Sequence, residues 1–494
     1  MATENVEFRV YNSMTRQKEV FKPKEPGKVK MYVCGVTSYD FSHIGHARAY
    51  VAFDLLYRYL RYLGYEVVYV RNFTDVHDKI IEMANILGRD PIALSGRCCQ
   101  EFLKDMDDLQ CLQPTHQPCV TEHMEQIKEM IAKMFFSVDS FPEYGRLSGR
   151  RLEDNQAAWN PADFALWKAA NPGEPSWESP WGPGRPGCDI ECSAMSAQYL
   201  THSYDIHGGG VDLTFPHHEN KIAQSWAACQ ESNVSYWMHN SFVNINNNKI
   251  STFLRNFHIR KVTQLYHPLA LRYCLLGIHY RSPFNFSISE MESASESVFY
   301  IYQTLRDCEE ALSAFQQGIG TAKNIRGHVE PRAQECINKL GNELKTKLSD
   351  DLHTPTILNG ALQEALKLMN SYLNILKREA QRQEHPSAAL SIAKLLKEVK
   401  AVLDVLGLLA GSTCAEVLQL LKERALRRAE LTEEDVLRAI EIRSVARQNK
   451  DFSRSDEIRA DLATKGISLM DITGTTQTDW RPCVRSLRLS WGNA

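Results

Sequence analysis

The sequence has no uncharged run of about 18 apolar residues, the length that a helix needs to cross a bilayer. Its first residues, MATENVEFRVYN, include Glu4 and Glu7 and no apolar core. They fit neither a secretory signal nor an acid-poor transit peptide. We therefore expect a cytosolic protein that does not associate with membranes.

An excess of positive charge is also missing. The chain has 57 Lys and Arg against 60 Asp and Glu, for a net charge of -3, so any nucleic-acid surface has to be local. Repeats and low-complexity segments are absent. The 13 cysteines are an odd number without a secretory signal, which argues against a disulfide framework. We expect buried thiols, some of which serve as metal ligands.

The 494 residues exceed one hydrophobic core and predict roughly three or four domains. The apolar run 29–36 predicts a buried strand, and apolar residues at helical spacing from Ala47 predict a helix that Gly64 closes. A second strand follows from Glu66, which makes a βαβ pattern typical of a parallel sheet. Segments 288–315 and 388–410 predict long helices, with a polar linker at 378–386.

Three short stretches carry residues suited to chemistry. His43 and His46 lie just before the predicted helix, where an anion is attracted, although an isolated HxxH pair is more often structural. The glycines of HGGGVDLTF (207–215) leave room for a flat base or make a plain turn. The third stretch, NNNKISTFLRNF (246–257), places Lys249 in a polar loop.

In this order, HIGH, HGGGVDLTFPHHEN and NNKIS resemble the motifs of class I aminoacyl-tRNA synthetases. YVCGVTSYDFSHIGHAR, RNFTDVHDKI, SFPEYGRLSGR, GRPGCDIECSAMS and LRYCLLGIHYRSPFNFS resemble the cysteinyl-tRNA synthetase family in particular, as do DDLHTPTILNGALQEAL and SDEIRADLATKGISLMD. The resemblance covers nearly the whole chain, and the set of motifs is highly specific.

The resemblance implies an α/β fold in which a Rossmann-like catalytic domain carries a shortened connective insertion and is followed by a helical bundle and a small anticodon-binding module. The corresponding ranges are 1–113 and 176–262 for the two catalytic halves, 114–175 for the insertion, 263–429 for the stem-contact and bundle region, and 430–494 for the terminal module. A monomer is expected, as is common in the family.

The implied activity is that of a cysteine-tRNA ligase, which makes cysteinyl adenylate from cysteine and ATP with Mg²⁺ and transfers the acyl group to tRNA(Cys). The implied catalytic residues are His43, His46, Lys249 and Thr252, which would meet charge on the reacting phosphates. The implied substrate-binding residues are Gly35, Thr37, Thr74, Cys188, His207, Gly208, Gly209, Gly210 and Asp212.

The resemblance also implies one zinc ion, which would distinguish a cysteine thiolate from a serine hydroxyl. The family's ligands are two cysteines, a histidine and a glutamate, and the matching positions are Cys34, Cys192, His217 and Lys221. Lysine at the glutamate position is a departure, because it brings an ammonium close to a dication. Lys221 either swings away, leaving three ligands, or weakens zinc binding; on a regular helix, His218 and Glu219 point elsewhere.

Other departures concern the catalytic loop and the pocket. The family's KMSKS loop is KISTF here, so Thr252 replaces a lysine, and Arg255, two residues beyond the motif, is a candidate to substitute for part of the missing charge. Cys188 and Asp189 replace Trp and His, and His77 replaces an acid. The connective insertion is shortened in two places.

These departures leave two alternatives to an active ligase. A catalytically impaired paralogue would retain tRNA or zinc binding, and ATP–pyrophosphate exchange separates it from the ligase. A cysteine ligase for an amino sugar resembles the same catalytic domain, but such enzymes lack an anticodon region, whereas this chain has about 60 residues after the bundle. Basic segments 421–428 and 444–450 are suited to RNA phosphates or are simply solvated helix faces.

Overall fold

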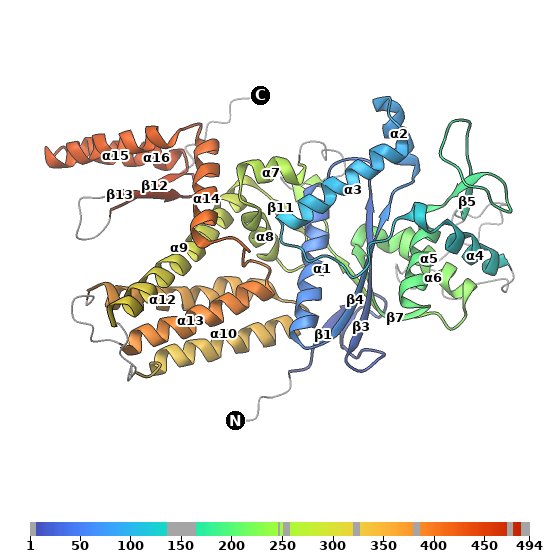
Figure 1. Ribbon diagram of the computed structural model, residues 1–494, viewed down its shortest axis with the longest axis horizontal. Coiled ribbons are helices and arrows are strands. Elements are labelled where there is room, and N and C mark those ends of the chain that lie inside the picture. The colour runs from blue at the N-terminus through green and yellow to red at the C-terminus, as the bar shows by residue number, and fades with distance from the viewer. Residues whose placement is uncertain are drawn as a thin grey trace. The chain divides into compact units, whose positions relative to one another are not determined.

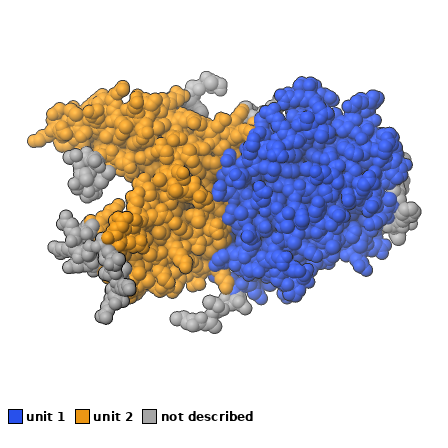
Figure 2. All heavy atoms as spheres, viewed as in Figure 1, with its two compact units in different colours: residues 1–243, 279–284, 346–353 blue, residues 244–278, 285–345, 354–494 orange. Residues whose placement is uncertain are grey.

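The computed structural model describes residues 6–135, 165–245, 248–249, 257–319, 327–378, 386–471 and 478–485. The chain divides into two compact units, coloured separately in Figure 2. The first comprises residues 1–243, 279–284 and 346–353, and the second comprises 244–278, 285–345 and 354–494. Among the helices of the described residues, none combines the length and the apolar character that crossing a membrane requires.

The first unit alternates strands and helices, as Figure 1 shows. Its strands are β1 Arg9–Asn12, β2 Gln17–Val20, β3 Lys28–Thr37, β4 Glu66–Thr74, β5 Trp167–Ala169, β6 Gly184–Pro186, β7 Ser203–Gly210 and β8 Asn233–Asn240. Its helices are α1 Ile44–Tyr62, α2 Asp78–Leu87, α3 Pro91–Asp108, α4 Met124–Phe135, α5 Cys188–Leu200 and α6 Glu219–Ala228, with 3-10 turns η1 Val120–Glu122 and η2 Val211–Leu213 and a π-helical turn η3 Thr214–His218.

The centre of this unit is a parallel sheet with the strand order β4-β3-β7-β8. Helix α1 lies on one side of the sheet, and α4, α5 and α6 lie on the other (Figure 1). The middle of β3, from Met31 to Cys34, is apolar and buried because a central strand of such a sheet is covered on both faces. The parallel α/β fold expected from the sequence is confirmed.

The predicted strand 29–36 is β3, one residue longer at each end. The predicted helix starts earlier than expected, because α1 begins at Ile44 and His43 is its N-cap. Ile44 is fully buried, so the first turn already packs into the core. His46 therefore lies inside the first helical turn and not before it. At the other end, Gly64 has φ of 89°, a conformation that favours glycine after a helix.

The second unit is mainly helical. Its helices are α7 Ile259–Leu265, α8 Pro268–Leu276, α9 Ile288–Ile319, most of α10 Pro331–Ser349, α11 Thr354–Thr356, α12 Leu362–Arg378, α13 Pro386–Val405, α14 Cys414–Ala429, α15 Glu433–Gln448 and α16 Phe452–Thr464, with a π-helical turn η6 Ile357–Ala361. Its strands are β10 Asn248–Lys249, β12 Ile467–Asp471 and β13 Thr478–Pro482, while β9 Val243–Ile245 and β11 Phe284–Phe286 begin where the chain passes between units.

Two packed groups form this unit's interior. Helices α9, α12 and α13 contact one another along apolar faces, as the long helical patterns of the sequence predict. Near the C-terminus, α14, α15 and α16 pack with the hairpin β12-β13 around a cluster centred on the buried Trp480. The five-part domain division given by the resemblance stays a prediction.

An ion-pair network in the first unit connects the start of α2 to the β5-β6 hairpin. The Asp78 carboxylate lies 2.9 Å from Arg185 Nη2 and 2.6 Å from Lys168 Nζ, and Arg185 also binds Glu174. Partial burial opposes ionisation of Asp78, but the two cations outweigh it and lower its pKa to about 2.

We expect Asp78→Asn to lower the free energy of unfolding by about 1 kcal/mol at pH 7, because the carboxylate is half exposed and solvent weakens its ion pairs. Its pKa is depressed by folding, so the stabilisation is present above the unfolded value near 4 and is lost as pH falls toward 2. Urea unfolding at pH 7, 5 and 3.5 checks this, with the exposed Glu82→Gln as control. A difference that stays constant over this range would contradict it.

Candidate functional site

A β-bulge places Cys34. Strand β3 pairs with β4 residue by residue up to Val33 and again from Val36, so Cys34 and Gly35 together face Asn72. A Cβ on Gly35 would lie 1.5 Å from the Asn72 carbonyl oxygen, so this position accepts only glycine. The Gly35 N–H donates instead to Asn72 Oδ1 at 2.9 Å. Bulges re-aim side chains, and this one lies beside the cluster described next.

Four side chains surround the sulfur of Cys34. The distances from its Sγ are 3.8 Å to Cys192 Sγ, 3.4 Å to His207 Nε2, 3.4 Å to His217 Nε2 and 3.3 Å to His218 Nε2. Tetrahedral zinc with bonds of about 2.3 Å to sulfur and 2.0 Å to nitrogen holds two sulfurs about 3.8 Å apart and sulfur and nitrogen about 3.5 Å apart. The spacing and the soft donors therefore fit a zinc ion.

The ligand atoms of Cys34, His217 and His218 lie within 4.8 Å of one another and form one possible metal group. A second possible group comprises Cys188, Asp189 and His217. His217 belongs to both, since its Nδ1 lies 2.6 Å from Asp189 Oδ1 while its Nε2 faces Cys34. Burial opposes charge on His217, but Asp189, Cys188 and Cys192 together raise its pKa well above the usual value.

Lys221 extends into the same region from α6. Its Nζ lies 3.1 Å from His207 Nδ1 and 4.1 Å from the centre of the Tyr32 ring. The side chain is 1% exposed, and burial lowers its pKa to about 8. His207 connects Lys221 to the cluster, because the other ring nitrogen of His207, Nε2, faces the Cys34 sulfur.

The expectation that His218 points away from this cluster is wrong. It assumed a regular helix from His217 onward, whereas Thr214–His218 is a π-helical turn and Phe215 has non-helical φ and ψ of -142° and 133°. The wider turn brings both neighbouring histidines to Cys34 Sγ. An uninterrupted HHEN pattern gives no signal for this turn in the sequence.

The two histidines of HIGH meet at the N-terminus of α1. Their rings stack with centroids 3.7 Å apart, and the His43 backbone N–H donates to His46 Nδ1 at 3.3 Å. Since Nδ1 accepts, the proton of His46 is on Nε2. Burial, followed by the neighbouring His43, lowers the pKa of His46 well below its usual value, so it is a neutral donor.

The remaining expected residues of the first unit lie on nearby elements. Gly35 and Thr37 are in β3, Thr74 ends β4, His207, Gly208, Gly209 and Gly210 are in β7, Asp212 is in η2, and Cys188 begins α5. Thr37 pairs with Thr74, whose hydroxyl donates to Glu191 at 3.1 Å. Burial raises the pKa of the Glu191 carboxyl well above normal. Cys188 is exposed at the start of α5.

The catalytic-loop residues belong to the second unit. Lys249 is in β10, where its backbone pairs with Asn244. Thr252 lies outside the described residues, as does Arg255. The sequence did not indicate three residues of this site. They are His218, Asp189, which is the partner of His217, and His239, whose Nε2 lies 2.8 Å from His218 Nδ1.

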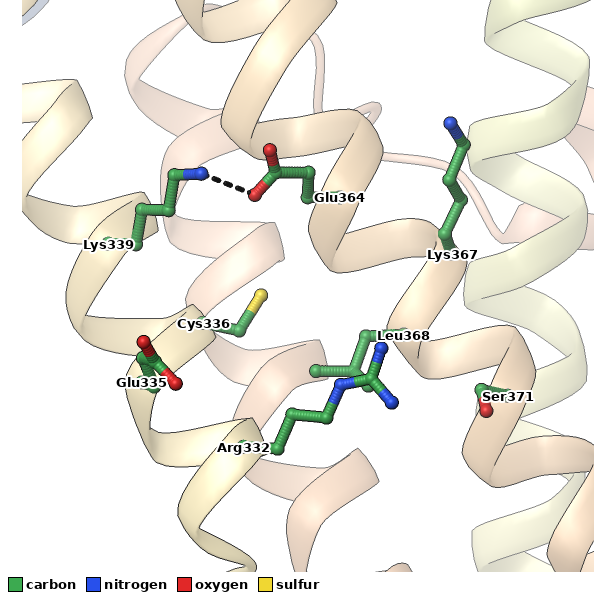
Figure 3. A pocket seen from close by; sticks show the side chains of 8 residues that line it. All are labelled: Arg332, Glu335, Cys336, Lys339, Glu364, Lys367, Leu368 and Ser371. Atoms are coloured by element: carbon green, nitrogen blue, oxygen red, sulfur yellow. Dashed lines mark hydrogen bonds and ion pairs between the residues drawn. The ribbon is translucent and has the colours of Figure 1, made fainter.

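A separate groove of about 390 Å³ lies between α10 and α12 in the second unit (Figure 3). Its lining includes three cations and two carboxylates, and Lys339 pairs with Glu364 at 2.6 Å. Opposite charges nearly cancel there, so the groove has little of the charge bias that an anion site needs.

Comparison with known proteins agrees with this geometry. Residues 20–296 match the family model described as tRNA synthetases class I (C) catalytic domain. The chain is 54% identical to Cysteine--tRNA ligase CPS1 homolog, chloroplastic/mitochondrial, of Oryza sativa subsp. japonica, over 97% of this chain and 86% of that protein. It is 52% identical to Cysteine--tRNA ligase 2, cytoplasmic, of Arabidopsis thaliana, over 98% of this chain and 99% of that protein.

A solved structure of Mycobacterium tuberculosis methionyl-tRNA synthetase in complex with methionyl-adenylate is similar with a TM-score of 0.55 and 14% identity, over 83% of this chain and 95% of that one. At this identity the likeness supports the class I fold alone. The matched family model and the near full-length identity to curated relatives show that the chain belongs to the cysteine-tRNA ligase family of class I tRNA synthetases.

Proposed function

We propose that this protein is an active cysteine-tRNA ligase, which joins cysteine to tRNA(Cys) through a cysteinyl adenylate. The observation that carries the proposal is that thiols and imidazoles converge on Cys34 in β3, while the HIGH pair follows on α1 just after the same strand. A thiol-selective group and a phosphate-binding group thereby belong to one unit.

His43 and His46 would act on the ATP phosphates. At the N-terminus of α1, the helix dipole favours an anion. The neutral His46 would donate from Nε2 to an α-phosphate oxygen as charge grows during attack by the cysteine carboxylate. Lys249 and Thr252 are proposed to meet the β- and γ-phosphates from the KISTF loop, and Mg²⁺ to accompany ATP.

The cluster at Cys34 would select the amino acid. Its two sulfurs and the His217 imidazole suit zinc, which when bound supplies a Lewis acid that prefers a thiolate to a hydroxyl. Asp189 accepts from His217 Nδ1 and so fixes the Nε2 face of that ring toward Cys34. The backbone of Gly208, Gly209 and Gly210 is proposed to approach the adenine, and Gly35, Thr37, Thr74, Cys188, His207 and Asp212 to bind the substrates.

The proposal extends to partners and location. The helical region 263–429 would support the tRNA and 430–494 would meet its anticodon. We place the protein in the cytosol as a monomer, which cell fractionation and sedimentation test directly.

Cysteine-dependent ATP–pyrophosphate exchange on the purified protein tests the function. We expect exchange with cysteine to exceed that with serine by a factor on the order of 10⁴ or more, because a thiolate-binding metal discriminates far better than a pocket that senses size. Alanine serves as a second control substrate. No exchange by folded protein that still binds tRNA would reject the ligase and leave the impaired paralogue.

A further inference from the structure

Two thiols and three imidazoles meet at the metal site, one donor more than the four positions expected from the family. Lys221 stands at the position of the expected carboxylate ligand, yet three histidine nitrogens lie 3.3 to 3.4 Å from Cys34 Sγ. We propose that His218 supplies the fourth protein ligand in this chain, and that Lys221 is a positioning residue that keeps His207 out of the ligand set. This inference rests on the proposed metal site.

His218 is built into the protein as a metal ligand would be. Its ring is fully buried and lies against Gly209, where a Cβ would come within 3.0 Å of it. A metal-bound imidazole normally donates its second N–H to an acceptor. His218 Nδ1 lies 2.8 Å from His239 Nε2, and His239 Nδ1 lies 2.8 Å from the Ser13 hydroxyl.

The direction of this hydrogen-bond chain decides which nitrogen of His218 is available. A serine hydroxyl accepts as well as donates, so His239 can hold its proton on Nδ1 and accept at Nε2. His218 then donates from Nδ1 and presents the Nε2 lone pair toward Cys34. Asp189 likewise accepts from His217 Nδ1, which directs Nε2 of that ring toward Cys34. Both imidazoles of the π-helical turn are thus held with Nε2 facing one sulfur.

Lys221 has the opposite effect on His207. His207 Nδ1 lies 3.1 Å from Lys221 Nζ and 2.9 Å from the Tyr204 hydroxyl. An ammonium has donors only and a tyrosine hydroxyl can also donate, so beside a charged Lys221 this nitrogen accepts. The proton of the neutral imidazole is therefore on Nε2, which lies 3.4 Å from Cys34 Sγ. His207 can donate to a thiolate there but has no lone pair for a metal. Lys221 itself lies on the Tyr32 ring face, a favourable place for a cation.

Zinc X-ray absorption of the zinc-loaded wild-type protein gives the first test. The proposal expects two sulfurs and two imidazole nitrogens in the first coordination shell. A single imidazole would overturn it, as would failure of the protein to bind zinc. This measurement needs no variant and so does not depend on any substitution folding.

Zinc affinity, measured by competition with a chromophoric chelator, gives the second test. We expect His218→Ala to weaken binding by more than about 100-fold, beyond the 10- to 100-fold loss typical of an outer-shell partner, for which Asp189→Asn is the internal reference. Lys221→Gln should bind zinc as well as the wild type or better, and Cys188→Ser should be unchanged. Thermal unfolding checks that each variant is folded.

Two results would overturn the proposal: His218→Ala binding within ten-fold of the wild type, or Lys221→Gln losing zinc as severely as His218→Ala. Loss in Cys188→Ser with retention in His218→Ala would assign the metal to the Cys188, Asp189 and His217 group instead. The Co²⁺-substituted protein adds a spectrum, in which the His218 variant should change the visible bands and Lys221→Gln should not. If X-ray absorption shows two imidazoles on zinc but the protein has no cysteine-dependent ATP–pyrophosphate exchange, the ligase activity is rejected and the ligand assignment stands.

Discussion

Replacing His46 by alanine lowers the rate of cysteine-dependent ATP–pyrophosphate exchange by about 100- to 1000-fold, the range typical for removing one donor from a developing negative charge. The expectation follows from the fixed geometry of the side chain. His46 Nδ1 is taken by the His43 backbone N–H, so only Nε2 is left to face a phosphate. Because its pKa is well below the usual value, His46 stays a neutral donor throughout the physiological pH range.

Two measurements make the His46 test specific. The exposed His328→Ala variant controls for the loss of a histidine elsewhere in the chain and should exchange at the wild-type rate. The loss in His46→Ala should appear in kcat more than in the KM for ATP, since the donor acts on charge that grows in the transition state. A loss below ten-fold, or one confined to KM, would contradict the assigned role.

Replacing Asp351 by alanine lowers the free energy of unfolding of the first unit by about 3 to 5 kcal/mol, as breaking a buried charge pair does. The Asp351 carboxylate is fully buried. Its oxygens accept from the Tyr11 backbone N–H at 2.9 Å, the Tyr280 hydroxyl at 2.7 Å and Arg281 Nε at 2.6 Å. Alanine leaves all three donors without this acceptor.

The neighbouring Asp350 provides a matched control. Its carboxylate pairs with Lys18 at 2.6 Å, but both side chains are more than a third exposed, so Asp350→Ala should cost less than about 1 kcal/mol. Tryptophan fluorescence during urea unfolding is a suitable readout, because six of the eight tryptophans lie in the first 243 residues. Equal losses in the two variants would show that the buried network does not stabilise this unit.

Much of the fold was predictable because its signals are periodic. The apolar run before HIGH predicts β3, and the spacing from Ala47 predicts most of α1. Asp351 lies in the segment DDLHTPTILNGALQEAL, whose pattern does not indicate a structural role for it. Its connection to Tyr280 and Arg281 joins segments about 70 residues apart, and no periodic pattern reports such a contact.

The candidate site was predictable in its residue types and not in its geometry. Cys34, Cys192 and His217 were expected together, and their contacts agree with a metal group. Helical spacing places adjacent residues about 100° apart and so predicts that His218 points away from His217, a rule that the π-helical turn breaks. The partner of Lys221 could not be deduced either, since His207 comes from β7 and meets it only through the tertiary fold.

The pairing at Gly35 has a consequence for changes in chain length. Strand β3 carries one residue more than β4 between two regular stretches, at Cys34 and Gly35 against Asn72. Losing a single codon inside a buried central strand ordinarily shifts every following side chain to the opposite face. Here the deletion of one residue would leave equal numbers of residues in β3 and β4, so the pairing of the two strands would remain regular. The Cys34 thiol would then lose its position in the cluster. That surplus residue serves the site and not the sheet.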